Sequence, residues 1–411
     1  MLKKLMLSAL IMVITLPLFG CGVSATGAPR TISEETAVVS DKTTVLTDVP
    51  GETSIPDLTN ATNREITDLV GRVVTIPKDP QRIAPMTGPS YEMVFMLGGQ
   101  DRIVMTKSGH TTNYPLALLT NPDLANYDGI GANPSSSVNI EDYLKREIDL
   151  VIYYLNDNEL EKFAAVKIPA IVLTLNTSLF ENIDDVKKMT LDEYIYNSTI
   201  AVGTLADIFG PDAIAEYEVW KKYNTEKIHM LYDRTHNLSD DQLKSIYWGN
   251  TWGENILSSY TLMNRYYEIR LCGGSLVGPE IGNGNFPEVT TEQLFAWDPE
   301  IILVDNHGNF PELVIKDMYK EGSKWASLQA VQNKQLHRIP AGIFFMDKGT
   351  TTTLMLVWLA TIIQPELFSD INVIEEIKYY YKEFYEFELT DEQAQKIIDG
   401  WYERVGDEPD L

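Results

Sequence analysis

Residues 211–233 read PDAIAEYEVWKKYNTEKIHMLYD, and this stretch predicts one long helix. Pro211 suits the first helical turn because its missing N–H costs no hydrogen bond there, and Asp212 favours the helix N-terminus. Gly210, just before them, ends an earlier helix whose start, Thr190-Leu191-Asp192-Glu193, fits a capping box. A helix with every internal hydrogen bond made bends less readily than extended strands, so it would connect its two flanks rigidly.

Short apolar runs alternate with helical patterns on both sides of this helix. Runs that are apolar on both faces and separated by helices are typical of a parallel sheet covered on both sides. The sequence therefore predicts the α/β class, with two Rossmann-like lobes joined by the long linker helix. The expected strands are 73–76, 82–84, 103–105, 150–153, 170–173, 245–248, 301–304 and 336–339, and the expected helices are 91–97, 140–145, 159–165, 260–271, 291–296, 350–362, 372–387 and 390–405.

The N-terminus carries an export signal. Lys3 and Lys4 precede an apolar stretch that is too short for a comfortable membrane span, and Leu18-Phe19-Gly20-Cys21 ends it. That ending resembles the bacterial lipoprotein signal, which implies that Cys21 is lipidated and becomes the first mature residue. The chain would then be exported and lipid-anchored to the outer face of the cell membrane, or lie in the periplasm. The other interpretation is an ordinary signal peptide, with Cys21 incidental.

The domain plan follows from these patterns. The residues after Cys21 are rich in Thr, Ser, Val, Pro and acids without sustained periodicity, which indicates a flexible tether. The predicted divisions are a lipoprotein signal peptide at 1–20, the tether at 21–65, an N-terminal α/β lobe at 66–210, the linker helix at 211–235, and a C-terminal α/β lobe with closing helices at 236–411.

Composition argues against several classes of partner and site. The formal net charge is -26 and no basic tract exists to replace phosphate counterions, so nucleic acid is not an expected partner. The same charge argues against a broad electrostatic contact with anionic lipid. Cys272 is the only cysteine besides Cys21, so we expect no internal disulfide. Without a CxxC pair, structural zinc and iron–sulfur sites are not expected either.

A series of short motifs runs through nearly all of the chain after residue 65. The motifs are Asp68-x-x-Gly71-Arg72, Pro80-x-Arg82-Ile83, Glu92 to Gly98, Asp101 to Val104, Asn139-Ile140-Glu141, Ile148 to Ile152, Cys272-Gly273-Gly274, Val289 to Leu294, Asp298 to Ile302, Trp358-Leu359-Ala360 and Gln364-Pro365-Glu366. Their order and spacing resemble those of the metal-chelate binding proteins of ABC importers.

The resemblance implies both a fold and a role. The fold is that of class III periplasmic binding proteins, in which a rigid helix lets the two lobes move only slightly around a shallow cleft. The role is that of a non-enzymatic, monomeric binding protein that delivers its ligand to an ABC permease and its ATPase. The implied ligand is a metal chelate (an iron–siderophore, haem or cobalamin), with no intrinsic cofactor.

Two glutamates of the resembled family contact arginines of the permease, and the matching positions here are Glu141 and Glu292. A carboxylate accepts a bidentate contact from a guanidinium, which fixes orientation as well as attraction. The other interpretation is that both are first-turn glutamates that interact with the helix dipole. The two interpretations are compatible.

Aromatic and amide side chains gather in the segments that follow the predicted strands. Ligands of open parallel sheets bind beyond the carboxyl ends of the strands, and aromatic walls suit a flat or bulky chelate. Trp248 and Trp252 flank such a strand end, although a tryptophan there is also typical of a lobe core. The predicted ligand-binding residues are Tyr91, His110, Tyr114, Tyr154, Trp248, Trp252, His307 and Phe345.

Histidines and arginines give further hypotheses about the ligand. His110 and His307 follow strands in opposite lobes and are candidate ligands for nickel or iron, the other interpretation being solvated loop histidines. His337, inside a predicted strand, is expected to be structural. Arg265 and Arg270 lie on a predicted helix, where we expect them on a solvated face. That leaves few cations for the cleft, which favours weakly charged chelates.

Other kinds of protein stay open. The closing stretch Tyr379–Tyr385 resembles the tail of some nickel and molybdate binders, so nickel, molybdate or tungstate in the same fold is an alternative. Thr111-Thr112 and Thr350–Thr353 offer hydroxyls for an oxyanion, although helix capping also explains the second run. An exported hydrolase has no GxSxG, HExxH or P-loop motif to support it. A surface sensor with this fold is the remaining alternative.

Overall fold

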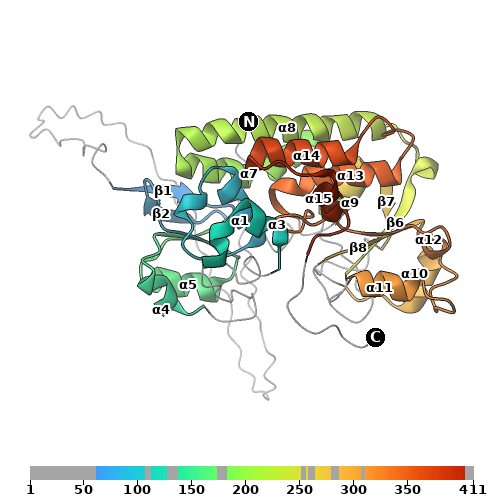
Figure 1. Ribbon diagram of the computed structural model, residues 1–411, viewed down its shortest axis with the longest axis horizontal. Coiled ribbons are helices and arrows are strands. Elements are labelled where there is room, and N and C mark those ends of the chain that lie inside the picture. Colours follow the sequence, from blue (N-terminus) through green and yellow to red (C-terminus); the bar gives the residue numbers. More distant parts are fainter. Residues whose placement is uncertain are drawn as a thin grey trace, which may run out of the picture. The chain divides into compact units, whose positions relative to one another are not determined.

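The computed structural model describes residues 62–106, 113–126, 138–173, 183–250, 256–257, 264–278, 287–306 and 311–402, all of which belong to one compact unit. Figure 1 shows their helices and strands, coloured along the sequence. Within these ranges no helix combines the length and the apolar character that crossing a bilayer requires. Four of the predicted site residues, Cys21, His110, Trp252 and His307, lie outside the described residues.

The first parallel sheet has the order β3-β4-β5, with β3 (Ile83–Pro85), β4 (Leu150–Tyr153) and β5 (Ala170–Val172). Every residue of these strands is buried, which explains why the sequence shows continuous apolar runs. The strand expected at 103–105 is reduced to a single bridge between Ile103 and Ile83.

An antiparallel pair of strands precedes this sheet. It consists of β1 (Asn63–Thr67) and β2 (Val73–Pro77), and β1 begins within the stretch assigned to the tether. The turn between them is held by Asp68, whose Oδ2 accepts from Arg72 Nε at 3.0 Å and from the Val172 amide at 3.1 Å. The same carboxylate therefore ties the hairpin to the end of β5.

Short helices alternate with the strands of the first sheet along the sequence or follow them. They are α1 (Gly88–Met96), η2 (Gln100–Arg102), α3 (Pro115–Thr120), η3 (Pro122–Asn126), α4 (Ile140–Lys145), α5 (Asp157–Ala165) and α6 (Ile183–Lys188). The patterns in the sequence indicated α1, α4 and α5. They gave no signal for α3 and α6. Helix α4 is equally short, but it begins with a side-chain cap at Asn139, which α3 lacks at Tyr114.

The second parallel sheet has the order β7-β6-β8-β9. Its strands are β6 (Lys244–Gly249), β7 (Gly274–Leu276), β8 (Ile301–Val304) and β9 (Leu336–Arg338). The strand β8 is central and fully buried, whereas β9 forms an edge. The helices of this region are η4 (Asp240–Gln242), α9 (Asn264–Leu271), α10 (Thr291–Trp297), α11 (Pro311–Met318), α12 (Gln329–Gln332), η6 (Gly349–Thr351) and α13 (Thr352–Ile363).

Two long helices connect the sheets in sequence. Helix α7 (Leu191–Phe209) begins with the capping box of Thr190 and Glu193 that the sequence predicted. It ends at Gly210, whose φ of 100° is a conformation that side chains disfavour. Helix α8 (Pro211–Thr235) follows directly and packs along α7, as Figure 1 shows. An ion pair of 2.6 Å joins Lys227 of α8 to Glu376, which belongs to a later helix, so α8 contacts that helix as well as α7.

Two closing helices follow, α14 (Val373–Tyr385) and α15 (Asp391–Ile398). Helix α15 is shorter than the expected 390–405. After it, the chain packs against the segment at 340–342, where the Trp401 amide donates to Ala341 O at 3.1 Å. One continuous cluster of buried apolar side chains contains residues of both sheets, among them Ile152 and Leu303. Cys272 is buried in the same cluster, and burial raises the pKa of its thiol.

Candidate functional site

A cavity of about 560 Å³ lies where helices near the first sheet meet residues that follow the second, and we call it the central cavity. Its lining includes Pro89 at the start of α1 and Leu173 just beyond β5, both at carboxyl ends of strands of the first sheet. From the other side come Arg265 of α9 and Lys348. Helix α7 forms a further wall, from Tyr194 to Thr204. Both halves of the chain thus contribute to one cavity, which on the side of the first sheet lies beyond the carboxyl ends of the strands, where open parallel sheets bind ligands.

A buried ionic network forms part of the lining. The side chains of Arg265 and Glu268 are each 4% exposed and pair with one another. The Arg265 guanidinium also donates to Asp347, both to its carbonyl oxygen and to Oδ2, the latter at 3.1 Å. The expectation of a solvated face for Arg265 was wrong, because the face of α9 that carries Arg265 packs against Asp347. Arg270, in contrast, donates to the carbonyls of Thr235 and Leu238 near the end of α8.

Two aromatic residues extend this network. The Tyr194 hydroxyl of α7 donates to Glu268 Oε1 at 3.3 Å, and burial raises the pKa of Tyr194. The Arg265 guanidinium lies 4.6 Å from the ring centroid of Trp248, a cation–π contact. The network therefore connects α7, α9, β6 and the Asp347 segment. Trp248 itself is fully buried, beneath Arg265.

Two predicted ligand-binding residues from opposite ends of the chain meet in an aromatic cluster. The Tyr114 ring lies 5.5 Å from Phe345, and each of these rings lies 5.1 Å from Tyr402. Phe344 packs on Tyr114 at 5.4 Å, and a Cβ at Gly88 would lie 2.2 Å from the Phe344 ring. Gly88 therefore lets α1 approach the second sheet region closely.

The remaining described candidates are Tyr91, Tyr154 and Trp248. Tyr91 is fully buried in α1, and its hydroxyl is 3.4 Å from Asn121 Nδ2. Tyr154 packs edge-on against Tyr153, with ring centroids 5.7 Å apart, and burial raises its pKa to about 12. Among the described candidates, a ring contact thus joins Tyr114 to Phe345. Burial raises the pKa of Tyr114, and Tyr154 lies close enough for its charge to raise the pKa of Tyr114 further.

Glu141 and Glu292 occupy equivalent places in the two halves of the chain. Each is exposed in the first turn of a short helix, Glu141 in α4 and Glu292 in α10. The preceding residues cap these helices: Asn139 Oδ1 accepts from the Glu141 amide at 3.3 Å, and Thr290 Oγ1 accepts from the Gln293 amide at 3.1 Å. Both glutamates are therefore accessible, and each stands in a first turn, where a negative charge interacts favourably with the helix dipole.

The threonine run at 350–353 is used inside the structure. Thr350 Oγ1 lies 2.9 Å from the Tyr385 hydroxyl, and Thr353 Oγ1 donates to Asn224 of α8. Helix α13 begins without a side-chain cap at Thr351, so the capping interpretation of this run was wrong. Thr352 alone of the four lines the central cavity.

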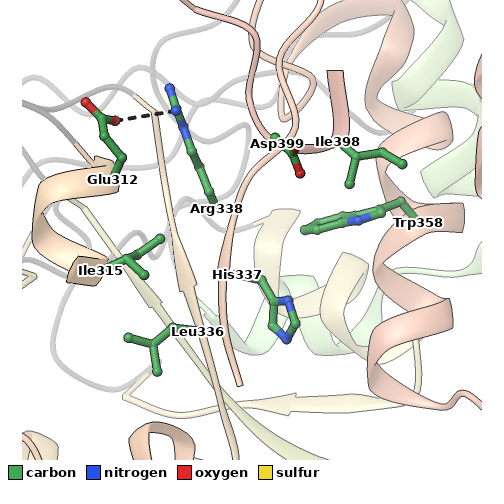
Figure 2. Close-up of a pocket in the computed structure, with 8 residues that line it drawn as sticks. All are labelled: Glu312, Ile315, Leu336, His337, Arg338, Trp358, Ile398 and Asp399. Atoms are coloured by element: carbon green, nitrogen blue, oxygen red, sulfur yellow. Dashed lines mark ion pairs between the residues drawn. The ribbon is translucent and has the colours of Figure 1, made fainter. Parts of the chain in front are cut away.

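A second pocket, of about 350 Å³, lies along β9, and we call it the edge pocket. Figure 2 shows Glu312 and Arg338 joined across one side of it and Trp358 on the other. The Glu312–Arg338 ion pair measures 3.4 Å. His337, expected to be structural, lies in β9 with Nε2 2.9 Å from Gln335 Oε1, and burial lowers its pKa. Among the described residues no group of three or more His, Cys, Asp or Glu is placed to hold a metal ion.

The sequence missed Glu268 and Asp347, which hold Arg265. Arg265 and Glu268 are three residues apart on one helix, a spacing that brings side chains together and could have suggested the pair. Asp347 ends a segment that follows a predicted strand, but no local signal linked it to Arg265, which lies 82 residues earlier in the chain.

The chain is similar to known solute-binding proteins in sequence and in fold. No protein-family model matches the chain. The molybdate-binding protein MolA of Haemophilus influenzae is 25% identical over 352 residues, which cover 81% of this chain and 94% of MolA. Its molybdate-bound crystal structure superimposes with a TM-score of 0.65 at 23% identity, covering 80% of this chain and 99% of that chain.

Other solved structures are similar to the same extent. A periplasmic solute-binding protein from Veillonella parvula has a TM-score of 0.65 at 22% identity, covering 82% of this chain and 97% of that one. Helicobacter pylori CeuE with Ni(II) bound has a TM-score of 0.62 at 17% identity, covering 82% and 99%. The predicted α/β fold, that of the class III periplasmic binding proteins, is thereby confirmed.

Proposed function

We propose that this chain is the solute-binding protein of an ABC importer, which captures a small metal-containing ligand outside the cytoplasm and passes it to a permease and its ATPase. Three observations support this proposal: the fold, a relative that matches along 94% of its length, and a cavity to which both halves of the chain contribute. The protein acts by binding, as the relatives do, and not by catalysis.

The charge balance of the central cavity is the main observation from which we infer the class of ligand. Among the described residues its lining has three carboxylates, Asp68, Glu268 and Asp347, and two cations, Arg265 and Lys348. Arg265 is paired with two of these carboxylates, and Asp68 with an arginine of its own turn. A small dianion such as molybdate meets no surplus of positive charge there, whereas a bulky chelate meets apolar walls and a few polar groups. The ligand we propose is a ferric siderophore, haem or cobalamin.

Molybdate or tungstate is the second candidate ligand, on the evidence of the relative. MolA binds molybdate by its name, and its similarity extends over most of both chains. The described cavity is larger than a tetrahedral oxyanion requires, since about 300–1,000 Å³ is typical of sites for organic ligands. Nickel is a third candidate through CeuE, with His110 and His307 as proposed ligands.

Isothermal titration separates these ligands. Ferric desferrioxamine B, haem, cobalamin, nickel and molybdate are titrated into the purified protein at low and at high salt. We expect one of the three chelates to bind with a dissociation constant of ~1 µM or tighter, with little dependence on salt. Binding of molybdate that weakens steeply with salt would establish the second candidate instead.

The organisation we propose has two lobes, 66–210 and 236–411, joined by the helix at 211–235. A lipid on Cys21 anchors the chain to the outer face of the membrane through the tether at 21–65, after removal of residues 1–20. Labelling of cells with a radioactive fatty acid tests the anchor. We expect incorporation into the parent protein and none into the Cys21→Ser variant, which would appear in the soluble fraction. Equal labelling of both proteins would contradict the assignment.

Glu141 and Glu292 dock the monomeric protein on the permease in this proposal. Their exposure and their places in matching helices support that role. Replacement of both by alanine should abolish ligand uptake by cells and leave ligand affinity unchanged. Glu161 and Glu321, exposed in other segments, serve as matched controls whose replacement leaves uptake intact. A loss of affinity in the double variant would show that the two glutamates do not act in docking.

A further inference from the structure

Glu159 of α5 is a buried carboxylate that the proposed function does not use. Its side chain is 9% exposed. Oε1 accepts from Lys162 Nζ at 2.8 Å, and Oε2 accepts from the Val138 amide, also at 2.8 Å. Burial would raise the pKa of Glu159, but the hydrogen bonds from Lys162 and Val138 outweigh burial and lower the pKa. The carboxylate is therefore charged at neutral pH, and both of its oxygens accept a hydrogen bond.

The Val138 amide lies just before the helix that carries Glu141. Asn139 follows Val138 and caps α4, because its Oδ1 accepts from the Glu141 amide. Helix α4 has only six residues, so its first turn makes up most of the helix. The bond to Glu159 thus fixes the point at which the chain enters this turn, three residues before Glu141.

A ring contact holds the middle of α4 on α5. Tyr143 and Phe163 are both buried, and their ring centroids lie 4.9 Å apart. Val138 and Ile140 pack against the apolar cluster to which these two rings belong. This packing holds α4 in place without Glu159. Loss of the bond from the Val138 amide should therefore free the first turn of α4 without releasing the whole helix.

In the second half of the chain, a backbone carbonyl takes the place of the Glu159 carboxylate. Val289 precedes the capping residue of α10, as Val138 precedes that of α4. The Val289 amide donates to Leu257 O at 3.0 Å. Both halves thus hold the chain at the same point before the helix of the docking glutamate. In the first half the acceptor is a side chain, so a substitution can remove it.

We propose that Glu159 is a positioning residue for docking on the permease: by holding the Val138 amide it fixes the first turn of α4 and so the place of Glu141. The inference rests on the proposed function, in which Glu141 contacts the permease. It predicts that docking depends on the reach of the side chain at position 159 and not on its charge.

Glu159→Asp and Glu159→Gln separate reach from charge. The aspartate variant keeps the charge, but its side chain is shorter, so the carboxylate withdraws from the Val138 amide. Because an acidic residue in the first turn of α5 still favours the helix dipole, the variant should fold. The glutamine variant keeps the reach and one oxygen for the amide, while Lys162, which is 38% exposed, can turn to water. Glu161→Asp is the matched control, since Glu161 is exposed on the same helix.

Docking is measured with the full chain carrying Cys21→Ser, so that no lipid holds it to membranes. It is added to right-side-out membrane vesicles from host cells that lack its gene, and the protein concentration at half-saturation is determined. Amide hydrogen exchange of residues 138–145 is followed in the free protein. Glu159→Asp should raise the half-saturating concentration about fivefold and accelerate exchange of the first turn, whereas Glu159→Gln should stay within about twofold of the parent in both.

A double variant tests whether Glu159 acts through Glu141. If it does, Glu159→Asp should cause no further loss of docking when Glu141→Ala is already present. A residue with a merely structural role would weaken docking in both backgrounds. The ligand affinity of Glu159→Asp should equal that of the parent for any ligand that the parent binds.

Three results would overturn the proposal: Glu159→Asp docks as the parent does, Glu159→Gln loses as much as Glu159→Asp, or the double variant loses more than Glu141→Ala alone. If the parent shows no saturable binding, or Glu141→Ala docks as well as the parent, docking through Glu141 is itself wrong, and the role of Glu159 in it is overturned as well. Exchange in the free protein still shows whether Glu159 holds the first turn of α4, so the two failures are distinguishable.

Discussion

Arginine pairs with carboxylates in the central cavity and in the edge pocket, but the two pairs have different surroundings. Arg265 and Glu268 are each 4% exposed, whereas Arg338 is 15% and Glu312 is 49% exposed. Water screens the outer pair, while the inner one has lost its hydration and depends on its partners. The same chemistry is therefore decisive for folding in one place and of little weight in the other.

The largest effect is expected from Arg265→Met, which leaves Glu268 and Asp347 buried without a counter-charge. The free energy of unfolding, measured with urea, should fall by about 3–5 kcal/mol. Arg270→Met, on the same helix, is the control and should cost less, because Arg270 donates only to backbone carbonyls. A loss below about 1 kcal/mol for Arg265→Met would remove the distinction between the two pairs.

Close packing beside the central cavity gives the next effect. Gly88→Ala brings a Cβ within 2.2 Å of the Phe344 ring, so α1 must move away from the second sheet region. We expect a loss of about 1–3 kcal/mol in thermal unfolding. Adding Phe344→Leu should recover part of it, because the smaller side chain frees the space. A double variant less stable than the sum of its single changes would contradict this packing.

Arg338→Met tests the edge pocket with the substitution used at Arg265. Its ion pair is 3.4 Å long, and its Nε donates to Asn306 Oδ1 at 2.5 Å. We expect a loss of about 1 kcal/mol in urea unfolding, mainly from the hydrogen bond. A cost equal to that of Arg265→Met would show that exposure does not separate the two sites.

The smallest effect concerns His337 in the edge pocket. Burial lowers its pKa below the usual 6.5, so on acidification the unfolded chain takes up this proton before the folded protein does. The contribution of His337 to stability is therefore present above about pH 6.5 and is lost as the pH falls. In the His337→Gln variant, the melting temperature should therefore fall less steeply as the pH is lowered than it does in the parent protein. An unchanged slope would indicate that His337 is solvated.

Local signals in the sequence were sufficient for much of the fold. The capping box at Thr190, the break at Gly210 and the apolar run of β8 each act over a few residues, and each appears in the structure as expected. The short helix α3 was missed because its six residues carry little periodicity and it begins without a side-chain cap, whereas the equally short α4 begins with one at Asn139.

The polar interior could not be foreseen in the same way. Helix α9 reads NRYYEIRL, in which nothing distinguishes a buried arginine from an exposed one. The burial of Arg265 is decided by Asp347, far along the chain, and that of Glu92 by η6. Tertiary contacts of this kind leave no periodic trace. The sequence indicated Tyr114 and Phe345 separately, as aromatic residues in segments that follow strands. It gave no sign that their rings are in contact.

Cys272 has a practical consequence. Its sulfur is enclosed, lies 3.4 Å from Leu356 O and is held in the protonated, unreactive form. A maleimide dye will therefore not react with it. In a form of the protein without residues 1–21, a new surface cysteine beside the central cavity can be labelled selectively without first replacing Cys272. The protein is in this respect a ready scaffold for a fluorescent sensor, in which the dye reports the arrival of each candidate molecule.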